Sequence, residues 1–150
     1  LYARLIVQAP RLAEGIAGVL ETLHGRFVMG VVTSSRKDQF DLIHRSTGLL
    51  KYFDFVLTAG DYAQTKPHPD PSLRAIEQAG VERDACVAVE DSERGLVSAT
   101  RAGIRCIVVP TPLTRGCRFV GAHHVLASVA EIPAVLSAEA SSAAAPYSSS

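Results

Sequence analysis

The chain has 150 residues, a length typical of one domain. It is 47% hydrophobic and 20% charged, which is typical of a globular protein and excludes a disordered one. Fifteen basic residues balance fifteen acidic ones, so no net charge attracts nucleic acid or an anionic membrane, and we expect neither as a partner. No apolar run is long enough to cross a bilayer, and the N-terminal residues do not resemble a signal peptide. The three cysteines lack metal-ligand spacing, so we expect free thiols in the cytoplasm.

Apolar periodicity predicts alternating helices and strands along the chain. In chain order, we expect a helix at 12–23, a strand at 27–32, a helix at 40–47, a strand at 55–57, a helix at 70–79, a strand at 86–89, a helix at 96–102, a strand at 106–109, a short edge strand at 124–126 and a helix at about 130–136. Asp70 is the expected N-cap of the third helix, with Pro71 in its first turn. The longer strands are continuously apolar, as in parallel sheets covered by helices on both faces. The sequence therefore predicts an α/β fold. The Ala/Ser-rich residues 137–150 are expected to be disordered.

Polar side chains follow three of the predicted strands, at the sheet edge where parallel sheets bind ligands. Thr33 and Ser34 follow the first strand, Lys66 comes after the second, and Glu90 and Asp91 follow the third. A hydroxyl with free N–H groups can bind an oxyanion, a fixed lysine can neutralise one, and paired acids suit Mg²⁺. Each feature also has a structural explanation. Thr33 could cap a helix, Lys66 could lie on the surface, and the acids could lie in an exposed turn before a Ser92 cap.

Taken together, the order of hydroxyl, lysine and acid pair closely resembles the haloacid dehalogenase superfamily, nearest to its phosphoglycolate-phosphatase and β-phosphoglucomutase-like branch. The resemblance covers about residues 1–136 and implies a three-layer Rossmann-like core. It implies that Thr33 and Ser34 hold the transferring phosphoryl group and that Lys66 neutralises its charge. It also implies that Asp91, assisted by Glu90, holds Mg²⁺, with Gly95 completing the last motif.

One family motif is absent, because no Asp-x-Asp occurs in these 150 residues. In the family, the first Asp of that motif attacks phosphorus and lies on the central strand of the sheet, upstream of a helical cap. The resemblance thus implies that residues 1–9 are the remnant of the last cap helix, that residues 10–136 are the core, and that the central strand is missing. The two strands beside the gap would then have exposed edges, so we expect a poorly soluble or loosely packed chain.

These features predict the core of a Mg²⁺-dependent phosphatase that acts on a small phosphorylated metabolite through an aspartyl-phosphate and is inactive as this chain. A sugar phosphomutase of the β-phosphoglucomutase type and a non-catalytic fragment that binds phosphate or a partner protein are the alternatives. A metal-free dehalogenase and a receiver domain fit less well, since the former needs no acid pair and the latter has its lysine last. We expect Arg36 to be solvated and His68 to pack in its loop. His123 and His124 lack a third ligand in the sequence pattern and are interpreted as structural or solvated.

Overall fold

The computed structural model describes residues 4–8 and 14–143 of the chain. Its strands and helices alternate along most of the sequence, as the periodicity predicts. They are β1 (Arg4–Gln8), α1 (Ile16–Leu23), β2 (Met29–Arg36), α2 (Lys37–His44), β3 (Phe55–Ala59), α3 (Asp70–Ala79), β4 (Cys86–Glu90), α4 (Glu93–Arg101), β5 (Arg105–Val108), β6 (His124–Val125) and α5 (Ile132–Ala143). None of the helices in the described part of the chain is long and apolar enough to cross a membrane.

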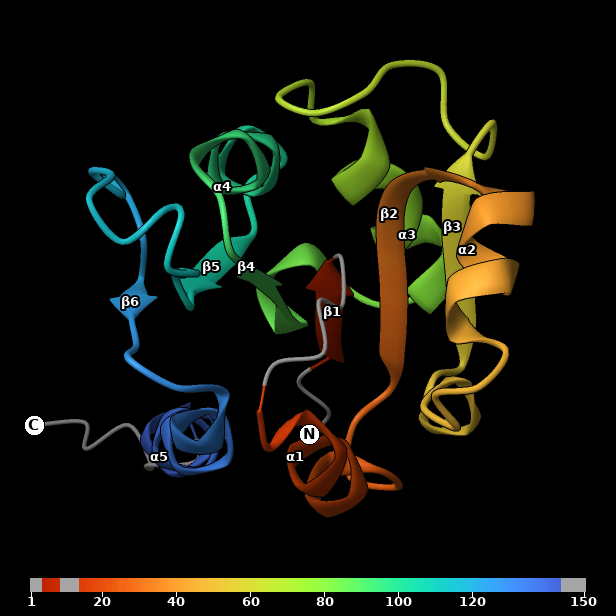
Figure 1. Cartoon of the computed structure of the whole chain (residues 1–150). Helices are drawn as coiled ribbons and strands as arrows, with labels where there is room; N and C mark the ends of the chain where they lie inside the picture. Colours follow the sequence, from red (N-terminus) through yellow and green to blue (C-terminus); the bar gives the residue numbers. More distant parts are fainter. Residues whose placement is uncertain (1–3, 9–13, 144–150) are drawn as a thin grey trace, which may run out of the picture.

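Within the described residues, the strands form one parallel sheet in the order β3-β2-β1-β4-β5-β6. Helices α1 and α5 lie together on one face, and α3 and α4 lie on the other (Figure 1). Successive residues of a strand point to opposite faces of the sheet. In β4, Val87 and Val89 therefore belong to the core beneath α1 and α5, and Cys86 and Ala88 belong to the core beneath α3 and α4. This arrangement confirms the predicted layered α/β fold.

The centre of the sheet differs from the sequence-based expectation, because Arg4–Gln8 forms strand β1 there. The helix predicted for residues 1–9 is therefore wrong for this segment, and the rest of that range lies outside the described residues. Leu5 pairs with Met29 of β2 on one side and with Val87 of β4 on the other. The segment contains Leu, Ile and Val in a row, and its two neighbours would otherwise carry unpaired edges, so both local preference and ladder bonds favour a strand. The predicted gap and its exposed edges are thus absent from the described sheet.

Two helix ends also differ from the predictions. Helix α5 continues to Ala143, although disorder was expected from residue 137; Ala is the best helix former, and buried Ile132 and Leu136 anchor the preceding turn. The remaining residues of that range, 144–150, lie outside the described part. In α3, the N-cap is Pro69, and Asp70 makes no cap bond. The Asp70 carboxylate instead accepts a hydrogen bond from the Gln64 N–H at 3.1 Å, which ties the preceding loop to the helix start.

Candidate active site

The polar residues singled out in the sequence lie at the carboxyl edge of the sheet. Val31 of β2 and Val89 of β4 both pair with Val7 of β1, so Thr33 and Glu90 follow at nearly the same level on either side of β1. Two strand spacings separate β2 from β4, a distance of about 10 Å. This width leaves room for a phosphoryl group above the end of the central strand, which closes with Gln8.

Lys66 and Glu90 form a buried pair at this edge. The Lys66 Nζ atom lies 3.4 Å from Glu90 Oε1, and the two residues are only 9% and 2% exposed. Burial raises the pKa of Glu90 to about 7, against the attraction of Lys66, and the negative charge of Asp91 raises it further. Burial also lowers the pKa of Lys66. Each charge is thus incompletely compensated by the other, and additional charged partners, a cation at the carboxylates and an anion at the ammonium, would stabilise both.

The start of α4 is built around the Glu90 carboxylate. Ser92 is the N-cap, and its hydroxyl accepts from the Gly95 N–H at 3.2 Å. A Cβ atom on residue 95 would lie 1.7 Å from Glu90 Oε2, so only glycine lets the helix approach so closely. The exposed-turn alternative is therefore wrong for Glu90, although Ser92 does cap the helix. Gly95 acts by leaving space for the carboxylate.

The loop that carries Lys66 is held by α4. The Arg94 guanidinium donates a hydrogen bond to the Lys66 carbonyl at 2.5 Å, and the Ser98 hydroxyl donates to the His68 carbonyl at 2.8 Å. The Lys66–Pro67 peptide bond is cis. These contacts hold the backbone at Lys66 and His68. Lys66 is buried, so the surface alternative for this residue is wrong. A lysine fixed in this way can act as a positioned charge for an anion.

Thr33 is buried, whereas Ser34 is exposed. The Thr33 hydroxyl accepts from the Ser35 N–H at 3.1 Å, and the Tyr62 hydroxyl donates to the Thr33 carbonyl at 2.8 Å. Helix α2 begins only at Lys37, so the capping alternative for Thr33 is wrong. In the part of the chain that the structure describes, no hydrogen bond joins Thr33 or Ser34 to Lys66 or Glu90. Thr33 and Lys66 therefore lie at the same edge of the sheet without a hydrogen bond between them.

Sequence reasoning missed two residues of this edge, Tyr62 and Arg94. Arg94 follows the acid pair in the same motif. Its place in the first turn of a helix at the same sheet edge as Lys66 is a signal that it could hydrogen-bond to the lysine loop. Tyr62 contacts a residue 29 positions away, and no local spacing predicts that contact. Both residues hold backbone carbonyls, so they position the neighbouring groups.

The other candidates behave as expected. Arg36 pairs with Asp38 at 3.0 Å, and both side chains are well exposed. The His68 ring accepts from the Asp70 N–H at 3.2 Å, which is a contact within its loop.

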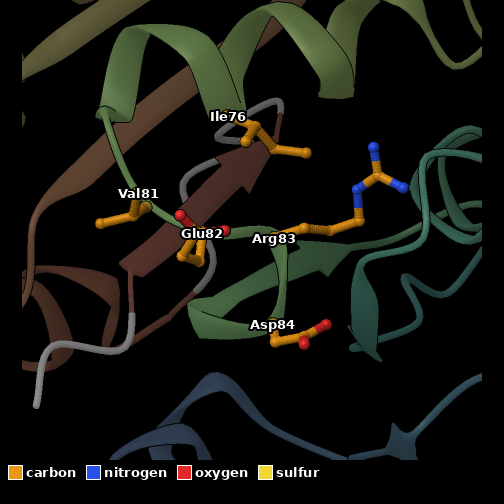
Figure 2. Close-up of a pocket in the computed structure, with 5 residues that line it drawn as sticks. All are labelled: Ile76, Val81, Glu82, Arg83 and Asp84. Atoms are coloured by element: carbon orange, nitrogen blue, oxygen red, sulfur yellow. The ribbon is translucent and has the colours of Figure 1, made fainter.

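An open pocket lined by Ile76 and residues 81–84 lies before β4, at the amino end of that strand (Figure 2). Its side chains point in different directions and do not converge on a common point, so this pocket does not carry the chemistry.

The carboxylates of Glu90 and Asp91 fit a hard cation. Mg²⁺ binds proteins through one or two carboxylates and completes its coordination with water and substrate phosphate. Among the residues described, no third His, Cys, Asp or Glu side chain joins these two in a tight group. Burial raises the pKa of Glu90 to about 7, and a cation beside this carboxylate would favour its charged form. The donor chemistry therefore suits a cation shared with an oxygen-rich substrate.

The comparisons with known proteins define the class. A family model described as haloacid dehalogenase-like hydrolase matches residues 2–109, and the chain belongs to that family. Protein CbbY of Cupriavidus necator is 39% identical over 119 residues, which are 77% of this chain and 47% of the relative. Hexitol phosphatase B of Escherichia coli K12 is 32% identical over 108 residues, 71% of this chain and 49% of the relative.

Solved structures agree with this assignment. CbbY from Rhodobacter sphaeroides, crystallised in complex with phosphate, matches with a TM-score of 0.73 and 32% identity over 80% of this chain and 55% of its own. The same relative has also been solved in complex with xylulose-(1,5)bisphosphate. This chain thus spans about half the length of these relatives. By family it is a hydrolase, related to phosphatases of sugars and other small metabolites.

Proposed function

We propose that this chain is the core of a Mg²⁺-dependent phosphatase for a small phosphorylated metabolite. The observation that carries the proposal is the buried Lys66–Glu90 pair beside Asp91 at the carboxyl edge of the sheet. Burying two charges costs desolvation free energy that their mutual attraction alone often does not repay. A dianionic phosphate and a divalent cation would supply the charges that this pair lacks.

Each residue has a role in this proposal. Thr33 and Ser34 bind phosphoryl oxygens from the β2 side, and Lys66 neutralises negative charge from the α3 side. Glu90 and Asp91 would hold Mg²⁺, which supplies positive charge to the oxygens of the phosphoryl group during transfer. Arg94 and Tyr62 position the lysine loop and the threonine segment through backbone carbonyls.

The attacking group is the missing part. By family resemblance, a carboxylate on the central strand attacks phosphorus and gives an aspartyl-phosphate, but β1 of this chain contains no acid. We therefore propose that this chain binds phosphate without turning substrate over. The substrate class is supported by relatives that are sugar phosphatases and by one that binds a pentulose bisphosphate. Cys106 and Cys117 are free thiols, which supports a reducing, cytoplasmic location.

A chimaera tests the proposed chemistry. The segment of a family phosphatase that carries Asp-x-Asp and the cap is joined ahead of residues 14–150 of this chain. We expect Mg²⁺-dependent release of phosphate from sugar phosphates. The chimaera then contains the attacking carboxylate together with Thr33, Lys66 and the Glu90–Asp91 pair. The Lys66→Met chimaera should lose at least about 100-fold in kcat, since it lacks a preorganised charge at the developing anion.

The products distinguish the alternatives. Conversion of one sugar phosphate into another without release of phosphate would favour the phosphomutase. A folded chimaera with neither activity, and with equal behaviour in the Lys66→Met form, would favour the non-catalytic fragment.

A further inference from the structure

A second group of potential ligands lies away from the active-site edge. His123 and His124 come just before and at the start of β6, and α5 brings Glu139 against them. The Glu139 Oε1 atom contacts Nε2 of His123 and lies 3.5 Å from Nε2 of His124. One ligand atom from each of the three residues lies within 4.8 Å of the other two. The sequence-based view that the two histidines lack a third ligand is therefore wrong.

We propose that His123, His124 and Glu139 bind one divalent transition-metal ion, with Zn²⁺ as the best fit. Two imidazole nitrogens and one carboxylate oxygen form a recognised zinc ligand set, with metal bonds near 2.0–2.1 Å. In a tetrahedral site of that size the ligand atoms lie about 3.4 Å apart. The separation of 3.5 Å between His124 Nε2 and Glu139 Oε1 matches this value. The His123 nitrogen lies closer to the same oxygen, so its ring would move outward when an ion binds.

The carboxylate is already oriented for such a role. Arg105 holds the other oxygen of Glu139 at 3.0 Å, and its guanidinium also donates to the Asp84 carbonyl at 3.1 Å. A ligand whose second oxygen is fixed by an outer hydrogen bond loses less freedom when it binds a metal. The Glu139 side chain is 18% exposed, while both imidazoles are 41% exposed. An ion can thus enter from solvent, and water can fill its fourth position.

The proposed site is separate from the phosphate edge. His124 pairs with Ile107, whose side chain belongs to the core on the α1 and α5 face. Glu90, in contrast, contacts Gly95 of α4 on the other face. The sheet lies between the two groups, and β6 is two strands from β4. A bound ion would therefore join α5 to the edge strand β6 and act as a structural link between them.

Titration of the metal-free 150-residue chain with Zn²⁺ tests this proposal. All measurements use a Cys117→Ser background, because Cys117 is an exposed thiol that could bind Zn²⁺ on its own. We expect one equivalent to bind and to raise the Tm, and hydrogen exchange in α5 to slow. His124→Ala and Glu139→Gln should each raise the dissociation constant at least about tenfold. His24→Ala, which removes an exposed imidazole elsewhere, should leave it unchanged.

Any of three results would overturn the inference. The first is the absence of zinc binding by the folded chain, which would leave the three side chains as an ion pair only. The second is binding that His124→Ala and Glu139→Gln, both folded by circular dichroism, do not weaken. Binding should also weaken as the pH falls, because imidazole must be unprotonated to bind a metal. Affinity for Zn²⁺ that is constant or rises toward acidic pH would likewise contradict the site.

Discussion

The 150-residue chain by itself is expected to release no measurable phosphate from sugar phosphates in the presence of Mg²⁺. Its central strand, β1, ends in Gln8, and no Asp-x-Asp occurs in the sequence. Phosphoryl transfer through an aspartyl-phosphate requires an attacking carboxylate, and the loss of a catalytic nucleophile lowers kcat by roughly 10⁴-fold or more. A discontinuous assay of inorganic phosphate, run with hexitol and pentulose phosphates, measures this directly.

The matched control is the chimaera that supplies the Asp-x-Asp segment. It should release phosphate under the same conditions, which shows that the substrates and buffer are suitable. Steady release by the unchanged chain, abolished by Lys66→Met but not by Lys37→Met, would contradict the expectation. It would mean that another group of this chain attacks phosphorus or activates water.

Replacing Lys66 with Met is expected to change stability in a way that depends on pH. The pKa of Glu90 is raised to about 7 in the folded chain, above its ordinary value of 4.5. The folded state therefore binds more protons than the unfolded state, and the free energy of unfolding falls as the pH rises from about 4.5 to about 7. Lys66 lowers the pKa of Glu90 by its charge. Without Lys66, that pKa rises further, and the loss of stability extends above pH 7.

The variant should consequently lose more stability at pH 8 than at pH 5, with a difference on the order of 2 kcal/mol. At pH 5 it should equal or exceed the parent chain, because Glu90 is then protonated and the costly burial of the Lys66 ammonium is gone. Urea unfolding at both values measures the change. Lys37→Met serves as the control, since Lys37 forms an exposed pair with Asp41 and should show no such pH dependence. An equal loss for Lys66→Met at both pH values would show that the two charges are not coupled.

Most of the candidate site could be predicted from the sequence because its parts follow apolar strands. Parallel strands place their carboxyl ends at one edge, so Thr33 and Glu90 had to share that edge once the strands were identified. The burial of Lys66 could not be predicted, because it depends on contacts that are distant in sequence. Arg94 and Ser98 hold the Lys66 loop and lie 28 and 30 residues from the carbonyls that they contact. Tyr62 was missed for the same reason, since its partner is distant in sequence.

The errors in the fold share a physical cause, which is tertiary context overriding local pattern. Arg4–Gln8 was interpreted as helical by resemblance, but the space between β2 and β4 offers hydrogen bonds on both sides, and the segment pairs there as β1. Residues 137–143 look like a polar tail, yet they continue a helix whose first turns are anchored in the core. That second error also concealed Glu139, and with it the third ligand of the two histidines.

The central claim is that Lys66, Glu90 and Asp91 form a site for phosphate and Mg²⁺ in a chain without the attacking group. Titration with inorganic phosphate, at zero and saturating Mg²⁺, tests it most directly by calorimetry or ³¹P line broadening. We predict saturable binding of one phosphate that Mg²⁺ strengthens and that Lys66→Met and Asp91→Asn each weaken at least about tenfold. Phosphate binding that is absent from the folded chain at every Mg²⁺ concentration, or is unaffected by both substitutions, would contradict the claim.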